Sequence, residues 1–396
     1  MATYDIESVI DWLVDGARSA REPEDVLLHI CESFVTAGFP LWRVAVFVRT
    51  LHPDVMGRRF IWREGEGVAV AAASYDRLDT PEYRESTFRY VCETGKVLRR
   101  RLADSDCPLD YETLPELRSE GATDYVAMPI VFTDGVIHVA TWTTRAPGGF
   151  TEAQLDAMAS IMKPLARVAE IRALRRTGVN LLDTYVGHQA GERIQAGRIR
   201  RGHTEAIHAA IWLSDMRGFT GLSNRLPPET LIDLLNRYFD CQVPPILERG
   251  GEVLKFMGDG LLAIFPVDRD GGDTGVSCAR ALDAARDARA RVAALGGEAQ
   301  GMLGAQLRFG LALHLGEVLY GNIGGGRRLD FTCIGPAVNL AARIEKLAGQ
   351  LGRVVLASAS FAENVAAGLV PLGAFDLPGF ASAQSVFGLA DEGAAV

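Results

Sequence analysis

The stretch from Ala206 to Phe265 constrains the fold of this chain more than any other part of the sequence. An apolar run, Ile207–Leu213, predicts a buried strand, and Asp215 lies at its end. Two later apolar runs predict a strand pair whose tight turn contains Asp259. An aspartate in a glycine turn is ordinary by itself, but two carboxylates at adjacent strand ends can bridge a pair of Mg²⁺ or Mn²⁺ ions. The pattern therefore predicts a two-metal site.

The segment between the two acids predicts a place for phosphate. A glycine-rich turn, Gly218–Gly221, leads from the strand toward a helix, and such turns present backbone N–H groups to anions. A helix is expected from Pro228 past Phe239, because its apolar residues recur at helical spacing. Pro244 and Pro245 predict that this helix is interrupted before the next strand.

Length and charge limit the classes of protein that this chain can represent. Its 396 residues are too many for one ordinary core, so two domains are expected. A net charge of −9 speaks against a general nucleic-acid binder. No apolar run reaches the roughly 18 residues that span a bilayer, and the N-terminus carries acids where a signal peptide has basic residues. We therefore expect a cytoplasmic protein with no membrane span, in which the six scattered cysteines are free thiols.

The first part of the chain predicts a small mixed domain. Helical, strand and long helical patterns follow one another at Asp5–Ala37, Trp42–Thr50, Arg59–Arg63, Tyr125–Phe132, Val136–Thr143 and beyond Phe150. With the ETGK at 93–96 and the segment GFTEAQLDAMASI, this order resembles a GAF-type sensor domain over residues 1–170. A small α+β domain used for dimer contacts is the alternative. Cys92 and Cys107 could attach a chromophore, but lone cysteines are more often packed apolar groups.

Residues 171–205 are expected to form a jointed, helix-rich linker. Four glycines, each costing a helix about 1 kcal/mol relative to alanine, are expected to interrupt a continuous rod; they are Gly178, Gly187, Gly191 and Gly197. Its arginines could meet anionic lipid or nucleotide, although a solvated linker face is the plainer interpretation.

Several ordered motifs in the last part of the chain identify a family. WLSDMRGFTGLS and GGEVLKFMGDGLLAIF are followed by LRFGLALHLGEVLYGNIGGGRRLDFTCIG, PAVNLAARIEKLA and GRVVLAS. Together they resemble the class III nucleotidyl cyclase catalytic domain over about residues 205–390. The resemblance implies an α+β chain, with a ferredoxin-like, palm-type cyclase domain at 206–396 joined by the helical linker to the GAF-like domain.

The resemblance also assigns roles to single residues. Asp215 and Asp259 match the family's two metal-binding aspartates, and the Met216 carbonyl would add a ligand to the second metal. Asn339 would position the ribose, and Arg343 would bind the α-phosphate as charge builds there. Taken separately, these two residues would be better explained as a helix amide and a surface salt bridge. The remaining substrate-binding positions are Gly218, Phe219 and Thr220.

Base choice would rest on Lys255 and Thr332, because the family's adenylyl members carry Lys with Asp, Thr or Ser there. A lysine can donate to adenine N1, and a hydroxyl can face the 6-amino group. Cys333 is one residue away from the cysteine position of guanylyl members. A strand-borne lysine is otherwise usually a surface residue whose stem covers apolar groups.

One position departs from the family's pattern. Leu377-Pro378-Gly379 stands where many members have a basic residue that contacts the triphosphate, so Lys346 or an arginine would have to substitute. His314 resembles a family position but is expected to be a packed histidine. Since the chain has one copy of each motif, the resemblance implies a homodimer that places Asp215, Asp259 and Lys255 opposite the partner's Asn339 and Arg343, with an arm tip at 324–328.

The sequence thus predicts an adenylate cyclase that converts ATP to 3′,5′-cyclic AMP and pyrophosphate with two Mg²⁺ or Mn²⁺ ions per site. A small-molecule or protein signal at the N-terminal domain would regulate it. Two alternatives stay open: a guanylate cyclase, and a catalytically weak signalling dimer that binds nucleotide or another ligand.

Overall fold

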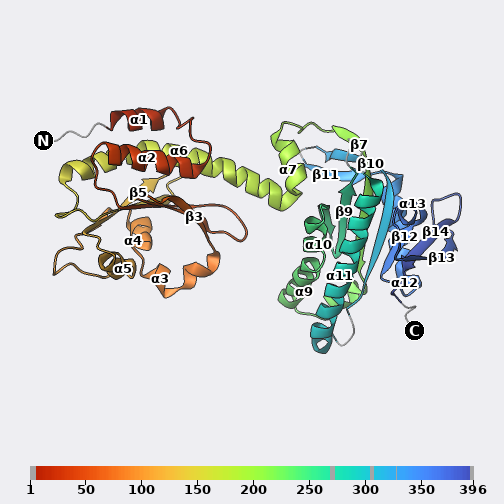
Figure 1. The fold of residues 1–396 in the computed structure, drawn as a ribbon. Coiled ribbons are helices and arrows are strands. Elements are labelled where there is room, and N and C mark those ends of the chain that lie inside the picture. The colour runs from red at the N-terminus through yellow and green to blue at the C-terminus, as the bar shows by residue number, and fades with distance from the viewer. Residues whose placement is uncertain (1–5, 268–272, 304–306, 327, 393–396) are drawn as a thin grey trace. The chain divides into compact units, whose positions relative to one another are not determined.

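The computed structural model describes residues 6–267, 273–303, 307–326 and 328–392. The chain divides into two compact units, residues 1–181 and 182–396 (Figure 1). This division falls inside the stretch expected to be a linker, and the predicted boundaries at 170 and 205 stay a prediction. Each unit has its own sheet, so both mix helices with strands. No helix in the described ranges combines the length and the apolar character needed to cross a bilayer.

A six-stranded antiparallel sheet with the order β3-β2-β1-β6-β5-β4 forms the middle of the first unit. Along β1, alternate side chains face opposite sides of the sheet, as strand geometry requires. Both sides are buried, which explains the unbroken apolar run of this strand. The strands are β1 (Arg43–Arg49), β2 (Gly57–Arg63), β3 (Gly67–Ala73), β4 (Leu98–Arg100), β5 (Asp124–Val131) and β6 (Ile137–Thr144).

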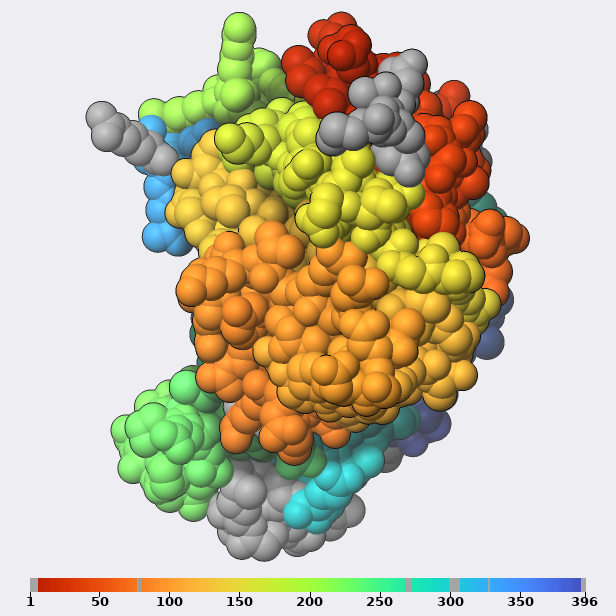
Figure 2. Space-filling model, turned by 90° about the vertical axis from the view of Figure 1, so that its left-hand side faces the viewer, coloured from red at the N-terminus to blue at the C-terminus, as the bar shows by residue number. Residues whose placement is uncertain are grey.

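Helices cover both faces of this sheet. The helices α1 (Glu7–Val14), α2 (Pro23–Thr36) and α6 (Glu152–Val186) lie on one face, and the short elements η1 (Tyr75–Asp79), α3 (Pro81–Arg84), α4 (Thr87–Thr94) and α5 (Thr113–Ser119) lie on the other. In Figure 2 the segment with α3 and α4 is orange, and α2 and α6 are red and yellow.

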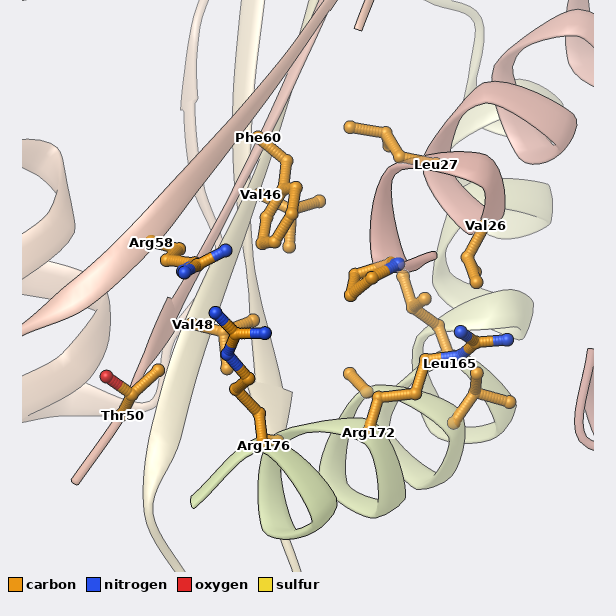
Figure 3. A pocket seen from close by; sticks show the side chains of 14 residues that line it. Val26, Leu27, Val46, Val48, Thr50, Arg58, Phe60, Leu165, Arg172 and Arg176 are labelled. Atoms are coloured by element: carbon orange, nitrogen blue, oxygen red, sulfur yellow. The ribbon is translucent and has the colours of Figure 1, made fainter. Parts of the chain in front are cut away.

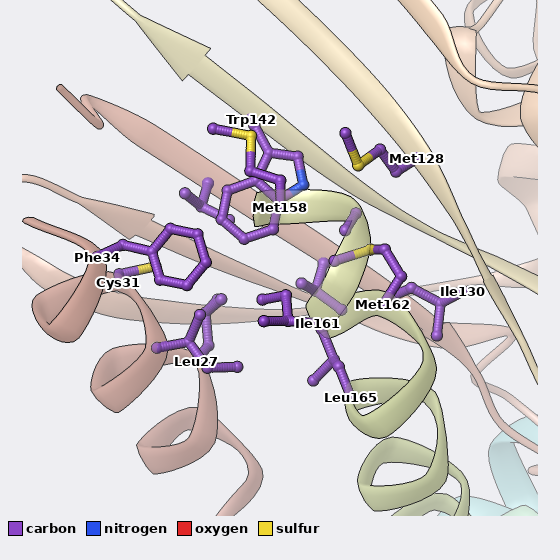
Figure 4. Close-up of a cluster of buried hydrophobic side chains, with 14 of the residues drawn as sticks. Leu27, Cys31, Phe34, Met128, Ile130, Trp142, Met158, Ile161, Met162 and Leu165 are labelled. Carbon is purple, nitrogen blue, oxygen red and sulfur yellow. The ribbon is translucent and has the colours of Figure 1, made fainter. Parts of the chain in front are cut away.

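The main core of the first unit lies between the sheet and the two longer helices (Figure 4). Phe34 from α2 stacks on Trp142 from β6 with ring centroids 5.7 Å apart, and both side chains are fully buried. Met158 and Ile161 of α6 complete the contact from the helix side. Full burial of aromatic and aliphatic side chains stabilises by about 1.5–3 kcal/mol each, so this layer holds α6 to the sheet.

One sequence prediction is wrong in this unit, and one strand was not predicted. The helix α6 runs without a break through Pro164 and Gly178, so Gly178 does not interrupt it. A single glycine costs about 1 kcal/mol, which is too little to end a helix of 35 residues that is packed along its first half. The break comes at Gly187, which has a left-handed φ of 87° and precedes α7 (His188–Gln195). Gly191 lies within α7, so the interruption predicted there is also wrong. The strand β3 was not expected, because its small side chains give no strong pattern.

The second unit is built on an eight-stranded sheet. Seven strands follow the order β13-β14-β12-β10-β7-β9-β8, and β11 pairs with the outer part of β10. The pair β10–β12 is parallel and its neighbours are antiparallel. The strands are β7 (Thr204–Met216), β8 (Glu252–Met257), β9 (Gly260–Pro266), β10 (Phe309–Gly325), β11 (Arg328–Ile334), β12 (Val355–Ser358), β13 (Leu369–Phe375) and β14 (Gln384–Leu389).

Two helical layers cover this sheet. One face carries α9 (Pro228–Asp240), α10 (Val243–Glu248), α11 (Thr274–Leu303) and α13 (Ala359–Ala362), and the other carries α7 and α12 (Pro336–Gln350). The interruption predicted at Pro244 and Pro245 is confirmed, because these prolines stand in the first turn of α10. The helix α11 was not among the expected elements.

Two buried histidines should make stability depend on pH. His138 of β6 accepts a hydrogen bond from the backbone N–H of Arg49, and Nδ1 of His314 of β10 lies 2.8 Å from the Ser358 hydroxyl. Burial, together with the charge of Arg49 in the case of His138, lowers the pKa of each to about 4. The unfolded chain then binds protons first, so stability is full above pH 6.5 and falls as pH drops toward 4.

We expect each histidine to account for a loss of up to about 3 kcal/mol between pH 6.5 and pH 4. Urea unfolding curves collected at several pH values in this window would measure the loss. His138→Gln should flatten the pH dependence, and an unchanged slope in this variant would contradict the assignment.

Candidate active site

The two predicted metal-binding acids lie at one edge of the second unit's sheet. Asp215 is the penultimate residue of β7. Asp259 is in the two-residue turn between β8 and β9, since Met257 pairs with Gly260. Gly258 before it has a φ of 69°, which type II′ hairpin turns require at their first central residue. Because β7 and β9 are neighbours, the strand end and the turn are brought together.

The two carboxylates face each other closely. A Cβ built on Gly260 would lie 3.2 Å from Oδ1 of Asp215, so the acid uses the space that a side chain at 260 would fill. Burial, and after it the negative charge of Asp259, raises the pKa of Asp215 above its usual value. The charge of Asp259 therefore disfavours ionisation of Asp215, and a cation between the two acids would relieve this repulsion.

Divalent cations fit this pair of residues. No group of three or more His, Cys, Asp or Glu side chains able to hold a metal was found in the described ranges. Two carboxylates with backbone oxygens suit Mg²⁺, which keeps several of its waters and binds through one or two carboxylates plus substrate phosphates. The Met216 carbonyl stays the proposed third oxygen; its side chain is buried.

An ion pair that sequence reasoning missed supports Asp215. Arg217 lies 2.7 Å from Oε1 of Glu345 on α12, and its Nη2 donates a hydrogen bond of 2.7 Å to the carbonyl of the same residue. Glu345 is buried, and burial raises its pKa while Arg217 opposes the rise. The pair passes over Gly310, where a Cβ would lie 2.0 Å from the guanidinium. It ties the end of β7 to α12.

Lys346 brings a second cation toward the acids. It is exposed on α12, and its charge lowers the pKa of Asp215 against the raising effects of burial and Asp259. The Lys346 ammonium therefore interacts with Asp215 of its own chain. Pro378, at the position where a basic residue was expected, is exposed, and Leu377 before it is buried in a separate apolar cluster.

The glycine turn after Asp215 forms the predicted helix start. Gly218 has a left-handed φ of 74° and precedes α8 (Phe219–Ser223). The first N–H groups of a helix have no acceptor within it, so those of Phe219 and Thr220 are available to a ligand. Gly218 and Thr220 are exposed, and Phe219 is half-buried against the core.

Asn339 and Arg343 lie on α12, and their side chains have no partner among the described residues. Asn339 is exposed and Arg343 is half-buried. Four residues apart, they lie on the same side of the helix. No hydrogen bond or ion pair in the described part of the chain joins either of them to Asp215 or Asp259. The surface salt bridge that would be the plain explanation for Arg343 is not formed among the residues that the structure describes.

A β-bulge decides where Lys255 points. Val253 pairs with Ala263 and Lys255 with Leu262, so Leu254 is an extra residue in β8. Because of this extra residue, Lys255 lies on the face of Leu262, toward α12 and β11, rather than toward α9. Its charge lowers the pKa of the Cys333 thiol against the effect of burial, which raises that pKa to about 12. Lys255 therefore lies near β11 of its own chain.

Thr332, the other predicted base-reading residue, is buried with an unpaired hydroxyl. Its side chain is 4% exposed, and Oγ1 has no hydrogen-bond partner within the described structure. A buried hydroxyl without a partner costs free energy, so a ligand that bonds it would be favoured.

His314 is buried against Ser358, which confirms that it is a packed histidine.

Comparisons with known proteins identify part of the chain. Residues 203–364 match the family model of the adenylate and guanylate cyclase catalytic domain. An adenylate cyclase of Anabaena cylindrica is 33% identical over 175 residues, which are 42% of this chain and 32% of that protein. An uncharacterized protein of Mycobacterium tuberculosis is 25% identical over 328 residues, or 78% of this chain and 54% of that protein. The chain spans about a third of the length of the first curated relatives it matches.

Solved structures of both kinds of cyclase are similar to this chain. The adenylyl cyclase CyaB of P. aeruginosa is 26% identical with a TM-score of 0.44, covering 48% of this chain and 97% of its own. The guanylyl cyclase Cya2 is 27% identical with a TM-score of 0.42, covering 48% of this chain and 95% of its own. The family-model match over residues 203–364 shows that this region carries an adenylate and guanylate cyclase catalytic domain.

Proposed function

We propose that this protein is an adenylate cyclase that converts ATP into 3′,5′-cyclic AMP and pyrophosphate at a homodimer interface. The observation that carries the proposal is the facing pair of Asp215 and Asp259 within a cyclase catalytic domain. Two acids of this kind, at adjacent strand ends and with a mutual repulsion that a divalent cation would relieve, suit a nucleotide triphosphate with its metal ions.

Each residue then has a defined task. Mg²⁺ or Mn²⁺ held by Asp215 and Asp259 would lower the pKa of the ribose 3′-hydroxyl and neutralise the leaving pyrophosphate. The N–H groups at the start of α8 would hold phosphate oxygens. Asn339 orients the ribose so that its 3′-oxygen faces the α-phosphate. Arg343 binds the α-phosphate, where its planar guanidinium matches two oxygens as negative charge develops.

A second copy of the chain would complete the site. Asn339 and Arg343 are unpartnered within the described chain and have no bond to the two acids, so the partner's copies are free to approach them. Large apolar side chains that are at least one-third exposed lie on β8 and on the arm formed by β10 and β11, where such a partner would bury them; they are Phe256, Met257, Leu319, Leu329 and Ile334. An isologous dimer has two such sites.

Mixing two inactive variants tests both the reaction and the shared site. Asp259→Ala and Asn339→Ala should each be inactive, and their mixture should recover about a quarter of the wild-type rate, because half of the randomly formed dimers hold one intact site. Cyclic AMP formation with Mn²⁺ would be measured after the subunits have exchanged.

Exchange is checked with differently tagged wild-type chains, whose co-purification shows that dimers re-form. If exchange is complete and the mixture stays inactive, the shared site is wrong. If the wild-type protein forms no cyclic nucleotide from either purine, the reaction itself is wrong, and the catalytically weak signalling dimer takes its place.

Adenine is the proposed base because of Lys255 and Thr332. Lys255 is directed toward β11 by the bulge, and Thr332 offers a buried, unpaired hydroxyl. A guanylate cyclase is the second candidate, because Cys333 is one residue away from the cysteine position of guanylyl members. The charge of Lys255 lowers the pKa of this thiol on β11, so the two side chains lie near each other. Comparison of ATP and GTP turnover by the purified protein separates the two.

Lys255→Glu should lower kcat/KM for ATP by about 10–100-fold, because a donor to adenine N1 becomes an acceptor and a charge-assisted bond is lost. The rate with GTP should fall less or rise. Steady-state kinetics with both nucleotides would measure the ratio, and an equal loss for the two would show that Lys255 does not read the base. Lys346→Glu, at an exposed position of α12 near Asp215, is the charge-matched comparison and should lower the rates with ATP and GTP equally.

We further propose that the first unit is a GAF-like sensor that regulates the cyclase. The helix α6 begins in the first unit and ends at Val186, and α7 follows it on the second unit's sheet. Ala190 of α7 is fully buried there, and the guanidinium of Arg193 lies 4.6 Å from the ring centroid of Tyr320. The Tyr320 hydroxyl donates a 2.5 Å bond to Glu252, the first residue of β8. The strand that leads to Lys255 and Asp259 is therefore fastened to α7.

If this coupling regulates the enzyme, crosslinks that fix the orientation of the linker in the dimer should change its rate. An unchanged rate in verified crosslinked dimers would argue against regulation through the apposition of catalytic domains.

A further inference from the structure

A pocket that lies wholly within the first unit has the character of a ligand site. It lies between the strands β1 and β2 on one side and the helices α2 and α6 on the other (Figure 3). Its cavity volume is about 80 Å³, several times the roughly 10–15 Å³ that one water needs, so it is not a packing defect of the size of one water.

The inner wall of this pocket is apolar. Its side chains are buried yet leave space between sheet and helices, and such a wall favours a hydrocarbon body over water. The wall residues are Val26, Leu27, Val46, Val48, Phe60 and Leu165. A polar ligand without an apolar body would leave this wall in contact with water.

The mouth of the pocket is positively charged. Arg58 of β2 and Arg176 of α6 line it, and Figure 3 shows both guanidinium groups pointing into the space between strand and helix. Neither has an ion pair or a hydrogen bond among the described residues, and no carboxylate lines the pocket. Arg172, by contrast, donates to the carbonyls of Ala17, Ala20 and Arg21 and is occupied.

Two unpaired guanidinium groups directed into one pocket repel each other, and an anion between them would reverse the sign of that interaction. The planar fork of arginine matches the two oxygens of a carboxylate. We propose that this pocket binds a small amphipathic carboxylate, with its hydrocarbon body against the apolar wall and its carboxylate between Arg58 and Arg176.

The ligand would touch the helix that leaves the unit. Leu165 and Arg176 belong to α6, so an occupant would contact this helix at both the wall and the mouth of the pocket. The proposal does not depend on the cyclase reaction, since binding is measured without nucleotide. Failure of either proposal leaves the other standing.

Decanoate is a suitable probe, and decanol is its neutral match. Isothermal titration calorimetry on the full chain, with EDTA and without nucleotide, should show saturable binding of decanoate at one site per chain. Decanol should bind at least about tenfold more weakly, because the charge-assisted bonds are absent. Absence of saturable decanoate binding, or equal binding of the two probes, would overturn the proposal.

Variants locate the site. Arg58→Met and Arg176→Met should each weaken decanoate binding by about 10–100-fold and leave decanol binding unchanged. Arg175→Met, one position along the same helix and outside the pocket lining, should bind as the wild type does. Ala169→Leu should block both probes by filling the pocket, and circular dichroism would verify that each variant is folded. Decanoate binding that survives both Arg58→Met and Ala169→Leu would place the ligand elsewhere.

Discussion

Asp259→Asn should lower cyclic AMP formation by about a thousandfold while the metal-free protein stays as stable as the wild type or becomes more stable. The loss of rate follows because the variant loses one of two carboxylates proposed to hold the metal ions, and metal ions contribute several kcal/mol of transition-state stabilisation. The gain in stability follows because Asp259 raises the pKa of Asp215, so the ionised pair destabilises the fold at neutral pH.

Two measurements on the same samples separate these effects. Thermal unfolding in EDTA reports the repulsion, and unfolding with Mg²⁺ or Mn²⁺ reports the ion. The wild type should gain stability from the ion, whereas Asp259→Asn should gain little. Asp233→Asn, on the exposed side of α9, is the control and should change neither rate nor stability. A variant that loses both rate and metal-free stability would show that Asp259 is a structural residue.

Arg217→Met should destabilise the second unit by about 3–5 kcal/mol, since it leaves a buried carboxylate without its cation. Glu345 is 4% exposed and has Asp215 near it, so the loss of Arg217 places two negative charges together in a poorly solvated position. The rate should fall as well, because Asp215 would shift away from the new repulsion. Urea unfolding and cyclase assays would measure the two effects.

A surface ion pair gives the matched control for this prediction. Arg237 contacts Glu298 at 2.6 Å, but both side chains are more than 40% exposed, so Arg237→Met should cost less than about 1 kcal/mol. The double variant Arg217→Met with Glu345→Met should regain most of the lost stability, because the uncompensated charge is gone. Equal losses of stability for Arg217→Met and Arg237→Met would mean that the buried pair of Arg217 and Glu345 stabilises the fold no more than a surface ion pair does.

The candidate site was largely readable from the sequence where local pattern decides the structure. The apolar run before Asp215 and the glycine turn around Asp259 each predict their own element, and the ordered motifs connect them. The register of β7 with β9 then brings the two acids together without any further requirement. The arrangement of Asn339 and Arg343 on one helix was equally accessible, because it depends only on helical spacing.

Other features depend on contacts that no local pattern reveals. The pair of Arg217 and Glu345 joins residues 128 positions apart. Counting alternation from Glu252 places Lys255 toward α9, and the register shift that reverses this is fixed by pairing with β9. Arg58 and Arg176, which line one pocket of the first unit, come from a strand and a helix that are far apart in the sequence. The interruption predicted at Gly178 is wrong because the packing of α6 outweighs the local cost of one glycine.

The bulge in β8 has a consequence for how nucleotide preference can change. Leu254 is the extra residue of the bulge, so its deletion would leave Lys255 opposite Leu262 and on the same face of the sheet. Insertion of one more residue before Lys255 would place it opposite Leu261 and turn the ammonium toward α9, away from the face that Leu262 shares with β11. If Lys255 reads the purine as proposed, nucleotide preference depends partly on the length of β8, and insertion of a single residue there would change it without altering Lys255 itself.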